Sequence, residues 1–381
     1  MKKVIKVIYL DYSATTPVIE EVLDSYNKVT KEYFGNPNSM HSLGIKSNEL
    51  LKSATKQISE IFRIKENEII YTSGSTESNN LALIGTALSH GKKGSHIIVS
   101  KLEHESIYGI CKYLESNGFV IDYVNNDNNG VIDFEDLKRL INKDTILVSI
   151  CAVNSELGIR EPLKTIKQII TKENPNVIFH SDMTQAIGKV PVNLADVDLA
   201  SMSGHKIYGP KGIGMLYKKS SVKIKPILYG SNSDLRPGTP ALPLIVSFSK
   251  ALRLANTDLD KKDAKIKKFN NRLIEFFAKY PNIKVNKTDY SIPNILNISL
   301  MNIKPETFIH ALEKYEVYVS SNTACSSGKI SNAVLSIYKD KQRALTTIRI
   351  SLSYLTTNIE VEDFMHIFDN VYKKLEELSS V

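Results

Sequence analysis

The sequence predicts an α/β protein with a large domain built on a mostly parallel sheet and a smaller C-terminal α+β domain. From about residue 75 to 220, helix-like stretches alternate with short β-branched runs, which is typical of βαβ units in a three-layer αβα arrangement. After a long helical stretch at 242–280, short strands and helices mix instead. We expect the large domain to span 15–255. The small domain would combine 1–14 with 256–381, and a cleft would separate the two.

Each element follows from a local pattern. The strands predicted in the large domain are HIIVS (96–100), TILVSICAV (145–153), NVIFHSD (176–182), DLASMSG (198–204) and GIGMLYK (212–218). Its helices include LALIGTALSHG (81–91), SIYGICKYLESNG (106–118) and PLKTIKQIITKEN (162–174). The small domain should contain strands at ILNISL (295–300), VYVSS (317–321) and TIRISLSY (347–354), with helices at 306–316 and 331–339. Thr357 and Glu360 have the spacing of a capping box that opens the last helix.

Composition excludes several classes of protein. The chain has 381 residues, of which 42 % are hydrophobic and 24 % charged, and no apolar run approaches the roughly 18 residues of a membrane helix. Lys6 interrupts the apolar N-terminal stretch, and no cleavage site follows, so we expect a cytoplasmic protein without a secretory signal. The net charge of +8 is modest, and its densest basic cluster, at 258–268, includes acids at helical spacing. A solvated helix face explains this cluster better than direct nucleic-acid binding does.

The three cysteines are too few and too scattered for a disulfide framework or a zinc site, so we expect no resident metal. Cys111 and Cys151 lie in apolar elements and should be buried. Cys325 lies in SSNTACSSGK, whose Ser, Asn, Thr and Gly residues favour neither helix nor strand. We therefore expect Cys325 to be an exposed thiol on a loop, able to reach into a cleft.

Lys206 and Asp182 suggest a cofactor. Lys206 follows an apolar strand, and alone it could be a basic loop residue. Asp182 ends the preceding strand, three residues before Gln185. The carboxylate of Asp182 could cap a helix beginning near Thr184, or it could hold a protonated heterocyclic nitrogen. Pyridoxal phosphate needs both a lysine for its Schiff base and a carboxylate for its ring nitrogen.

A third segment, TSGSTES at 72–78, follows a short strand and opens an apolar helix. Small hydroxyl residues at a helix N-terminus can bind a phosphate through backbone N–H groups and their own O–H groups. Ordinary helix capping is the alternative. A phosphate is, however, what a cofactor held by Lys206 and Asp182 would bring.

Eight segments occur in the order seen in cysteine desulfurases. They are LDYSATTP (10–17), FGNPNSMHSLG (34–44), YTSGSTESNN (71–80), LEHES (102–106), FHSDMTQAIGK (179–189), SMSGHKIYGPKGIGML (201–216), SSNTACSSG (320–328) and TIRISL (347–352). The chain resembles the NifS/IscS-like group of these enzymes, within the class V pyridoxal-phosphate-dependent aminotransferase family. The resemblance runs from about residue 9 to the C-terminal helix and implies the fold type I architecture.

The resemblance implies how the cofactor is held. Lys206 would form the Schiff base, Asp182 would pair with the pyridine nitrogen, and Gln185 would contact the ring hydroxyl oxygen. His104 matches the histidine that stacks on the ring, although a lone histidine at a strand end could equally be a satisfied core residue. The phosphate-binding positions match Ser75, Thr76, Ser203 and His205. Asn154 matches the asparagine beside the ring and the substrate carboxylate.

The resemblance also implies the substrate and the reaction. Arg349 could lie on an exposed strand face, but a planar guanidinium suits bidentate binding of the L-cysteine carboxylate. Lys206 would move the α-proton, with His104 as a proton donor or acceptor. The thiolate of Cys325 would attack the substrate sulfur, which releases alanine and leaves a persulfide on Cys325.

The resemblance implies protein partners as well. The family forms homodimers in which a threonine, here Thr239, reaches the partner's phosphate; the loop at 229–239 is shorter than in the family. The persulfide sulfur would pass to an iron–sulfur scaffold or a thiolation carrier for tRNA, and Cys325 would be a transient contact with an iron–sulfur cluster. Selenocysteine cleavage and transamination are alternative reactions, and a non-catalytic scaffold protein is a third interpretation of the sequence. A transaminase needs no loop thiol, and a scaffold needs no such set of reactive residues.

Overall fold

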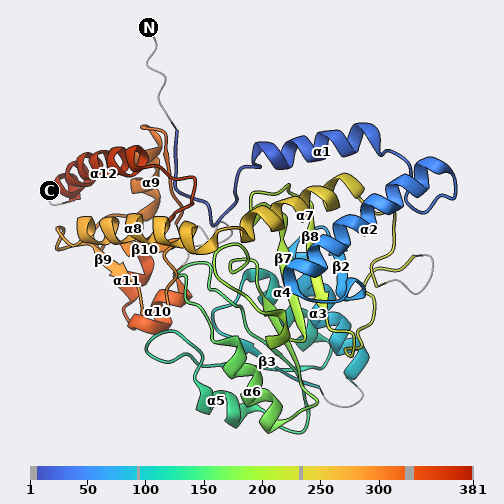
Figure 1. Ribbon diagram of the computed structural model, residues 1–381. Coiled ribbons are helices and arrows are strands. Elements are labelled where there is room, and N and C mark those ends of the chain that lie inside the picture. Colours follow the sequence, from blue (N-terminus) through green and yellow to red (C-terminus); the bar gives the residue numbers. More distant parts are fainter. Residues whose placement is uncertain (1–6, 92–94, 231–234, 322–329, 380–381) are drawn as a thin grey trace.

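A seven-stranded sheet forms the centre of the larger part of the molecule (Figure 1). The computed structural model describes residues 7–91, 95–230, 235–321 and 330–379. The strand order is β2-β8-β7-β6-β5-β3-β4. The strands of this sheet are Ile69–Thr72 (β2), His96–Ser100 (β3), Val120–Val124 (β4), Thr145–Ser149 (β5), Ile178–Asp182 (β6), Leu199–Ser203 (β7) and Gly214–Lys218 (β8). Strand β8 runs antiparallel to both neighbours, whereas the pairs from β7 to β4 are parallel, so the predicted mostly parallel sheet is confirmed.

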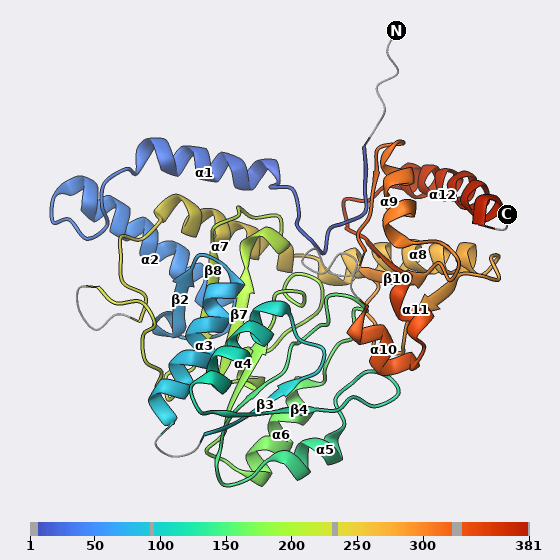
Figure 2. The ribbon, with the colours of Figure 1, turned by 180° about the vertical axis from the view of Figure 1, so that it is seen from behind.

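Helices cover both faces of this sheet because its strands are apolar on both sides. Ile97 and Val99 of β3 join a core beneath α3 and α4, while Ile98 between them joins the core on the other face. Residues of α2, α6 and α7 contribute to that second core. Figure 2 shows α3 and α4 on the face turned away in Figure 1. The helices are α1 (Glu20–Glu32), α2 (Ser42–Phe62), α3 (Ser75–His90), α4 (Glu105–Ser116), α5 (Phe134–Leu140), α6 (Leu163–Glu173) and α7 (Leu242–Asn256).

The C-terminal part has its own core and a small antiparallel sheet of order β12-β10-β9. These strands are β9 (Lys284–Asn286), β10 (Ile295–Ser299) and β12 (Thr347–Ser351). Near the N-terminus, β1 (Ile8–Tyr9) pairs in parallel with β11 (Val317–Tyr318), so Ile8 and Leu10 enter the same core. The helices are α8 (Leu259–Phe277), α9 (Pro305–Glu313), α10 (Asn332–Tyr338), α11 (Lys341–Leu345) and α12 (Asn358–Ser379). The domain limits 15–255, and 1–14 with 256–381, stay a prediction.

Two details bear on the expected elements. The stretch 242–280 is two helices rather than one, because Asp258 adopts a left-handed conformation (φ 53°) between α7 and α8. The capping box before α12 is confirmed: Thr357 N–H donates to Glu360 Oε2 at 2.8 Å, and Glu360 N–H donates to Thr357 Oγ1 at 3.2 Å. Across the described ranges, no helix combines the length and apolarity needed to cross a lipid bilayer.

Candidate active site

A cavity of about 260 Å³ opens at the carboxyl ends of the parallel strands. In open α/β sheets, ligands bind at this edge, because the loops that follow neighbouring strands converge there. Among the predicted site residues, the cavity is lined by Ser75, Thr76, His104, Asp182, Gln185, His205, Lys206 and Arg349. The fold therefore brings together side chains from the loops after β2, β3, β6 and β7, together with one from β12.

Lys206 ends a short 3₁₀ turn, Gly204–Lys206, directly after β7. Its amine donates to the carbonyl oxygens of Ser13 at 2.6 Å and Ala14 at 2.8 Å. The N-terminal segment is held against this turn because Thr16 N–H and the Thr16 hydroxyl both donate to the His205 carbonyl. The lysine amine is thus positioned in the cavity by a segment nearly 200 residues away in sequence.

Asp182 makes the predicted capping contact and also lines the cavity. Its Oδ1 atom accepts from Thr184 N–H at 2.9 Å, which is the capping contact. Its Oδ2 atom accepts from Asn79 Nδ2 at 2.8 Å, and the residue, only 6 % exposed, lines the cavity. The carboxylate is therefore held in one orientation at the end of β6.

Sequence reasoning missed Asn79. It is fully buried on α3, where its Nδ2 group donates to Asp182 Oδ2 and, at 3.0 Å, to Ser106 Oγ. The available signal was a pair of asparagines at the start of an otherwise apolar helix. A buried amide on a helix needs partners outside the helix, so such a residue is a candidate for a polar network.

His104 is the N-cap residue of α4. Its Nδ1 atom accepts from Ser106 N–H at 3.1 Å and lies 2.9 Å from Ser106 Oγ. Because Nδ1 acts as an acceptor, the proton of the neutral ring belongs on Nε2. His104 thus has a proton-bearing nitrogen besides the one used in capping, and it lines the cavity.

The start of α3 has the properties of an anion site. Gly74, the N-cap residue, provides no side-chain cap, which leaves the first N–H groups of α3 for a ligand beside the hydroxyls of Ser75 and Thr76. The hydroxyl of Ser203 lies close to Gly74, although Ser203 is buried and does not line the cavity. Burial, and then the positive charge of Lys206, lower the pKa of His205 to about 4, so this ring is a neutral hydrogen-bonding group.

Arg349 is buried in β12 rather than exposed on a strand face. Its Nη2 atom pairs with Asp11 Oδ1 at 3.0 Å, and its Nη1 atom donates to the Ser155 carbonyl at 3.0 Å. Within the described part of the chain, its Nε atom has no hydrogen-bond partner. A buried guanidinium that lines a cavity is suited to bind a carboxylate there.

Gln185 is buried beside Lys206 and uses both ends of its amide. Its Nε2 atom donates to the Ser13 carbonyl at 2.9 Å, and its Oε1 atom accepts from the amine of Lys189 at 2.5 Å. The structure thus adds Lys189, which the sequence reasoning did not single out, to the surroundings of the cavity.

Cys151 is buried, as expected, but it also lines the cavity. Its thiol donates to the Leu102 carbonyl at 3.3 Å. Burial and the nearby carboxyl of Glu103 raise the pKa of this thiol well above its usual value. Cys151 therefore stays a protonated thiol and a poor nucleophile.

Besides Ser203, the predicted residues Asn154 and Thr239 do not line the cavity. Asn154 donates to the Leu102 carbonyl and accepts from the N–H groups of Glu156 and Leu157, so its amide holds a backbone turn beside the cavity. Thr239 is exposed on the segment before α7. Cys325 lies outside the described residues.

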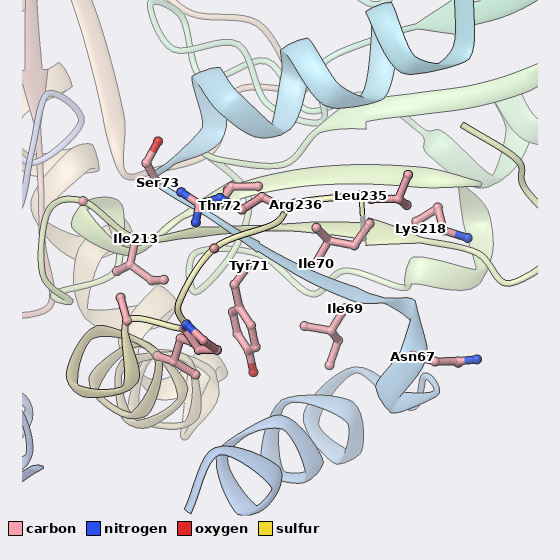
Figure 3. A pocket seen from close by; sticks show the side chains of 15 residues that line it. Asn67, Ile69, Ile70, Tyr71, Thr72, Ser73, Ile213, Lys218, Leu235 and Arg236 are labelled. Atoms are coloured by element: carbon pink, nitrogen blue, oxygen red, sulfur yellow. The ribbon is translucent and has the colours of Figure 1, made fainter. Parts of the chain in front are cut away.

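A second cavity, of about 370 Å³, lies along the edge strand β2 (Figure 3). Ile69, Ile70 and Tyr71 of β2 line it together with Leu235 and Arg236. Arg236 Nε donates to Glu77 Oε1 at 3.0 Å, which ties this segment to α3. Lys206 and Asp182 line the first cavity and not this one, so the candidate chemistry belongs to the first.

Comparison with known proteins agrees with this arrangement. The family model for class V aminotransferases matches residues 8–364. The NifS/IcsS protein homolog of Lactobacillus delbrueckii subsp. bulgaricus is 37 % identical over 382 residues, covering 98 % of this chain and 99 % of that protein. Cysteine desulfurase IscS of Dictyoglomus turgidum is 36 % identical over 380 residues, covering 98 % and 96 %. The solved structure of a NifS-like protein superposes with a TM-score of 0.91 at 32 % identity, covering 97 % of this chain and all of that one.

The structural match confirms the predicted fold, with its three-layer part and smaller C-terminal part. The sequence match extends over nearly the whole chain rather than over a few motifs. The chain therefore belongs to the class V aminotransferase family and, within it, to the NifS/IscS-like cysteine desulfurase group.

Proposed function

We propose that this protein is a pyridoxal-phosphate-dependent cysteine desulfurase, which takes sulfur from L-cysteine and releases L-alanine. The observation that carries the proposal is that Lys206, Asp182 and Arg349 line one cavity. An amine, a carboxylate and a guanidinium in one cavity match the needs of the cofactor and of an amino-acid substrate. The names of the relatives support the choice of reaction.

The donor set of the cavity fits pyridoxal phosphate. Asp182 suits the ring nitrogen, Lys206 the aldehyde and His104 the ring face. The phosphate suits the start of α3 together with Ser75, Thr76, Ser203 and His205. When bound, the cofactor supplies an electron sink for negative charge at the substrate's α-carbon.

Arg349 orients the substrate. The guanidinium lines the cavity and is held in place through its Nη2 atom by Asp11, so it can bind the L-cysteine carboxylate. Lys206 then takes the α-proton and returns it.

Cys325 receives the sulfur in this proposal. The chain on either side of the segment that carries it is tied beside the cavity. Ser320 forms a β-bridge with Arg349, and the Ser331 hydroxyl donates to Glu156 Oε2 at 2.5 Å. The described residues that flank this segment are thus held close to the cavity that Arg349 lines, which supports the choice of Cys325 as the thiol that receives the sulfur.

The sulfur-transfer step balances without an added oxidant. The Cys325 thiolate attacks the substrate sulfur, and an S–S bond forms while the Cβ–S bond breaks. The electron pair stays on the substrate carbon, which takes up a proton for which His104 is the proposed source. L-Alanine leaves, and Cys325 remains as a persulfide.

The proposal extends to the partners. The persulfide sulfur passes in the cytoplasm to an acceptor protein, either an iron–sulfur scaffold or a thiolation carrier. The protein acts as a homodimer in which Thr239 reaches the partner's phosphate. Exposed apolar side chains support such an interface: Phe34 is 73 % exposed, Met40 95 % and Tyr229 82 %.

The test measures L-alanine and sulfide together after L-cysteine is added to the purified protein with pyridoxal phosphate and a reductant. We expect equal amounts of both products. Cys325→Ser should keep the visible cofactor absorbance and lose at least about 100-fold in sulfide release. Lys206→Ala should lose the absorbance of the covalently bound cofactor. Cys111→Ala, which removes a buried thiol outside the cavity, is the control and should stay active.

Undiminished sulfide release by Cys325→Ser would refute the role of that thiol. Pyruvate in place of alanine would refute the reaction and leave the cofactor assignment standing.

A further inference from the structure

Lys189 lies behind the cavity, where it contacts Gln185, and is not used in the proposed chemistry. It lies four residues after Gln185 in the turn that follows β6, and its N–H group donates to the Ala186 carbonyl at 3.0 Å. The side chain is half-buried, and its amine bonds to Gln185, which is only 6 % exposed. A lysine that turns its amine toward a buried amide instead of toward solvent incurs a desolvation cost, so its contact calls for an explanation.

The contact with Lys189 gives the Gln185 amide a direction. The amide could be placed with its oxygen and nitrogen exchanged, and its neighbours decide between the two orientations. The Ser13 carbonyl can only accept, so it requires Nε2 on its side, at 2.9 Å. The Lys189 amine donates to Oε1 on the other side. Both neighbours select the same orientation. Neither contact uses the second N–H of Nε2, and Gln185 lines the cavity.

The opposite orientation would be repelled at the Ser13 end, and at the Lys189 end whenever the amine is charged. The oxygen of Gln185 would face the Ser13 carbonyl, and its NH₂ group would face the hydrogens of the Lys189 amine. Burial, followed by the positive charges of Lys206 and Arg349, lowers the pKa of Lys189 well below its usual value. The amine carries hydrogens in both protonation states, so it can donate to Gln185 Oε1 in either one. Only the charged form lacks a lone pair that could accept from the NH₂ group of Gln185.

We propose that Lys189 is a positioning residue for the cofactor, which holds the Gln185 amide so that an N–H group, and not the carbonyl, faces the ring oxygen of pyridoxal phosphate. The inference rests on the proposed function, because it concerns how the same cavity binds its cofactor. A donor stabilises the ionised ring oxygen, whereas a carbonyl would repel it. Lys189 thereby acts on the cofactor through Gln185 and without touching it.

The chain offers a matched control for the charge of Lys189. Lys262 lines the same small hollow behind Lys206, together with Lys189 and Asp263. Its amine donates to the carbonyls of Leu254 at 2.6 Å and Ala255 at 3.2 Å, and neither contact involves Gln185. Replacing Lys262 by Met removes one lysine from this hollow and leaves the amide of Gln185 held at both ends.

The experiment titrates the cofactor-free full-length protein with pyridoxal phosphate and follows the visible absorbance. We expect Lys189→Met to weaken cofactor binding about tenfold and to shift the absorbance maximum. Lys262→Met should bind within about twofold of wild type. Lys189→Arg, which keeps a donor, should restore most of the affinity. The cofactor-induced rise in melting temperature, measured for each variant against its own cofactor-free form, separates lost affinity from lost stability.

A double-mutant cycle tests whether Lys189 acts through Gln185. If it does, Lys189→Met will weaken binding no further in a Gln185→Ala background. Wild-type affinity and absorbance in Lys189→Met would overturn the inference. So would equal losses in Lys189→Met and Lys262→Met, or losses that simply multiply in the double variant. Wild-type protein that binds no pyridoxal phosphate would overturn the proposed function and this inference with it.

Discussion

At the scale of single residues, Asn79 connects two cavity side chains that lie on separate loops. Its Nδ2 group donates to both Asp182 Oδ2 and Ser106 Oγ, and Ser106 Oγ in turn lies 2.9 Å from His104 Nδ1. One amide therefore orients the carboxylate proposed for the ring nitrogen and the histidine proposed for the ring face. Networks of this kind hold reacting groups in place because each member is positioned by the next.

We expect Asn79→Ala to lower desulfurase activity and cofactor affinity by about tenfold each, because Asp182 and Ser106 lose a shared donor. Asn80→Ala is the control at the next position of α3. The Asn80 side chain donates to the Thr76 carbonyl of its own helix and has no contact with Asp182. Initial rates and cofactor titrations of the two variants check the prediction. Equal behaviour of the two variants would contradict it.

At the scale of elements, the position of α3 depends on a close approach between β8 and the turn that precedes the helix. A Cβ atom on Gly214 would lie 2.6 Å from the Cα atom of Gly74 and 2.6 Å from the Met202 carbonyl oxygen. Only a glycine at this place in β8 lets the turn lie flat on the sheet. The start of α3, and with it the proposed phosphate site, is thus located by backbone contact.

Gly214→Ala should displace the Gly74 turn, because the new Cβ atom would contact the backbone of Gly74 and Met202, which cannot move aside as a flexible side chain can. We expect a loss of about 1–3 kcal/mol in the free energy of unfolding and weaker pyridoxal phosphate binding. Gly109→Ala on α4 is the control, since outside the adjacent turns of its own helix no described atom lies within 4 Å of the added Cβ, and it should bind the cofactor normally. Urea unfolding and cofactor titration measure both effects. A Gly214→Ala variant as stable as Gly109→Ala would argue against this account of α3.

At the scale of the whole molecule, buried carboxyls make stability depend on pH. Glu161 is 5 % exposed, and it accepts from Ile132 N–H at 3.2 and 3.3 Å through its two oxygens. Burial raises the pKa of Glu161 to about 8 from an ordinary value of 4.5. The folded protein therefore holds this proton more tightly than the unfolded chain does. Its stabilising effect is complete below pH 4.5 and is lost as the pH rises toward 8.

Glu161→Gln should remove this dependence, because the amide is neutral at every pH in the range. We expect the free energy of unfolding of the variant, relative to wild type, to rise steadily from pH 5 to pH 8, by at most about 1.4 kcal/mol per pH unit. Urea unfolding of the cofactor-free proteins at four pH values gives the difference. A difference that is constant with pH would show that Glu161 ionises normally in the folded state.

The sequence by itself determined the class of fold and the identity of most candidate groups. Strands such as His96–Ser100 and Ile178–Asp182 are short β-branched or apolar runs between helical stretches, so local periodicity sufficed to predict them. Lys206 and Asp182 stood out because Lys206 follows a strand and Asp182 ends one, and parallel strands bring their carboxyl ends to one edge. Cys325 was predicted from its surroundings in the sequence and stays a prediction, outside the described residues.

Only the tertiary structure decided how these groups are held. Arg349 pairs with Asp11, and Lys206 donates to the Ser13 carbonyl, although the two residues of each pair lie far apart in the sequence. Neither the burial of Asn79 nor the turn of the Lys189 amine toward Gln185 can be predicted from local patterns. The periodicity of apolar residues indicates which face of a helix or strand is buried. The direction of a side-chain hydrogen bond depends instead on partners that only the folded chain brings together.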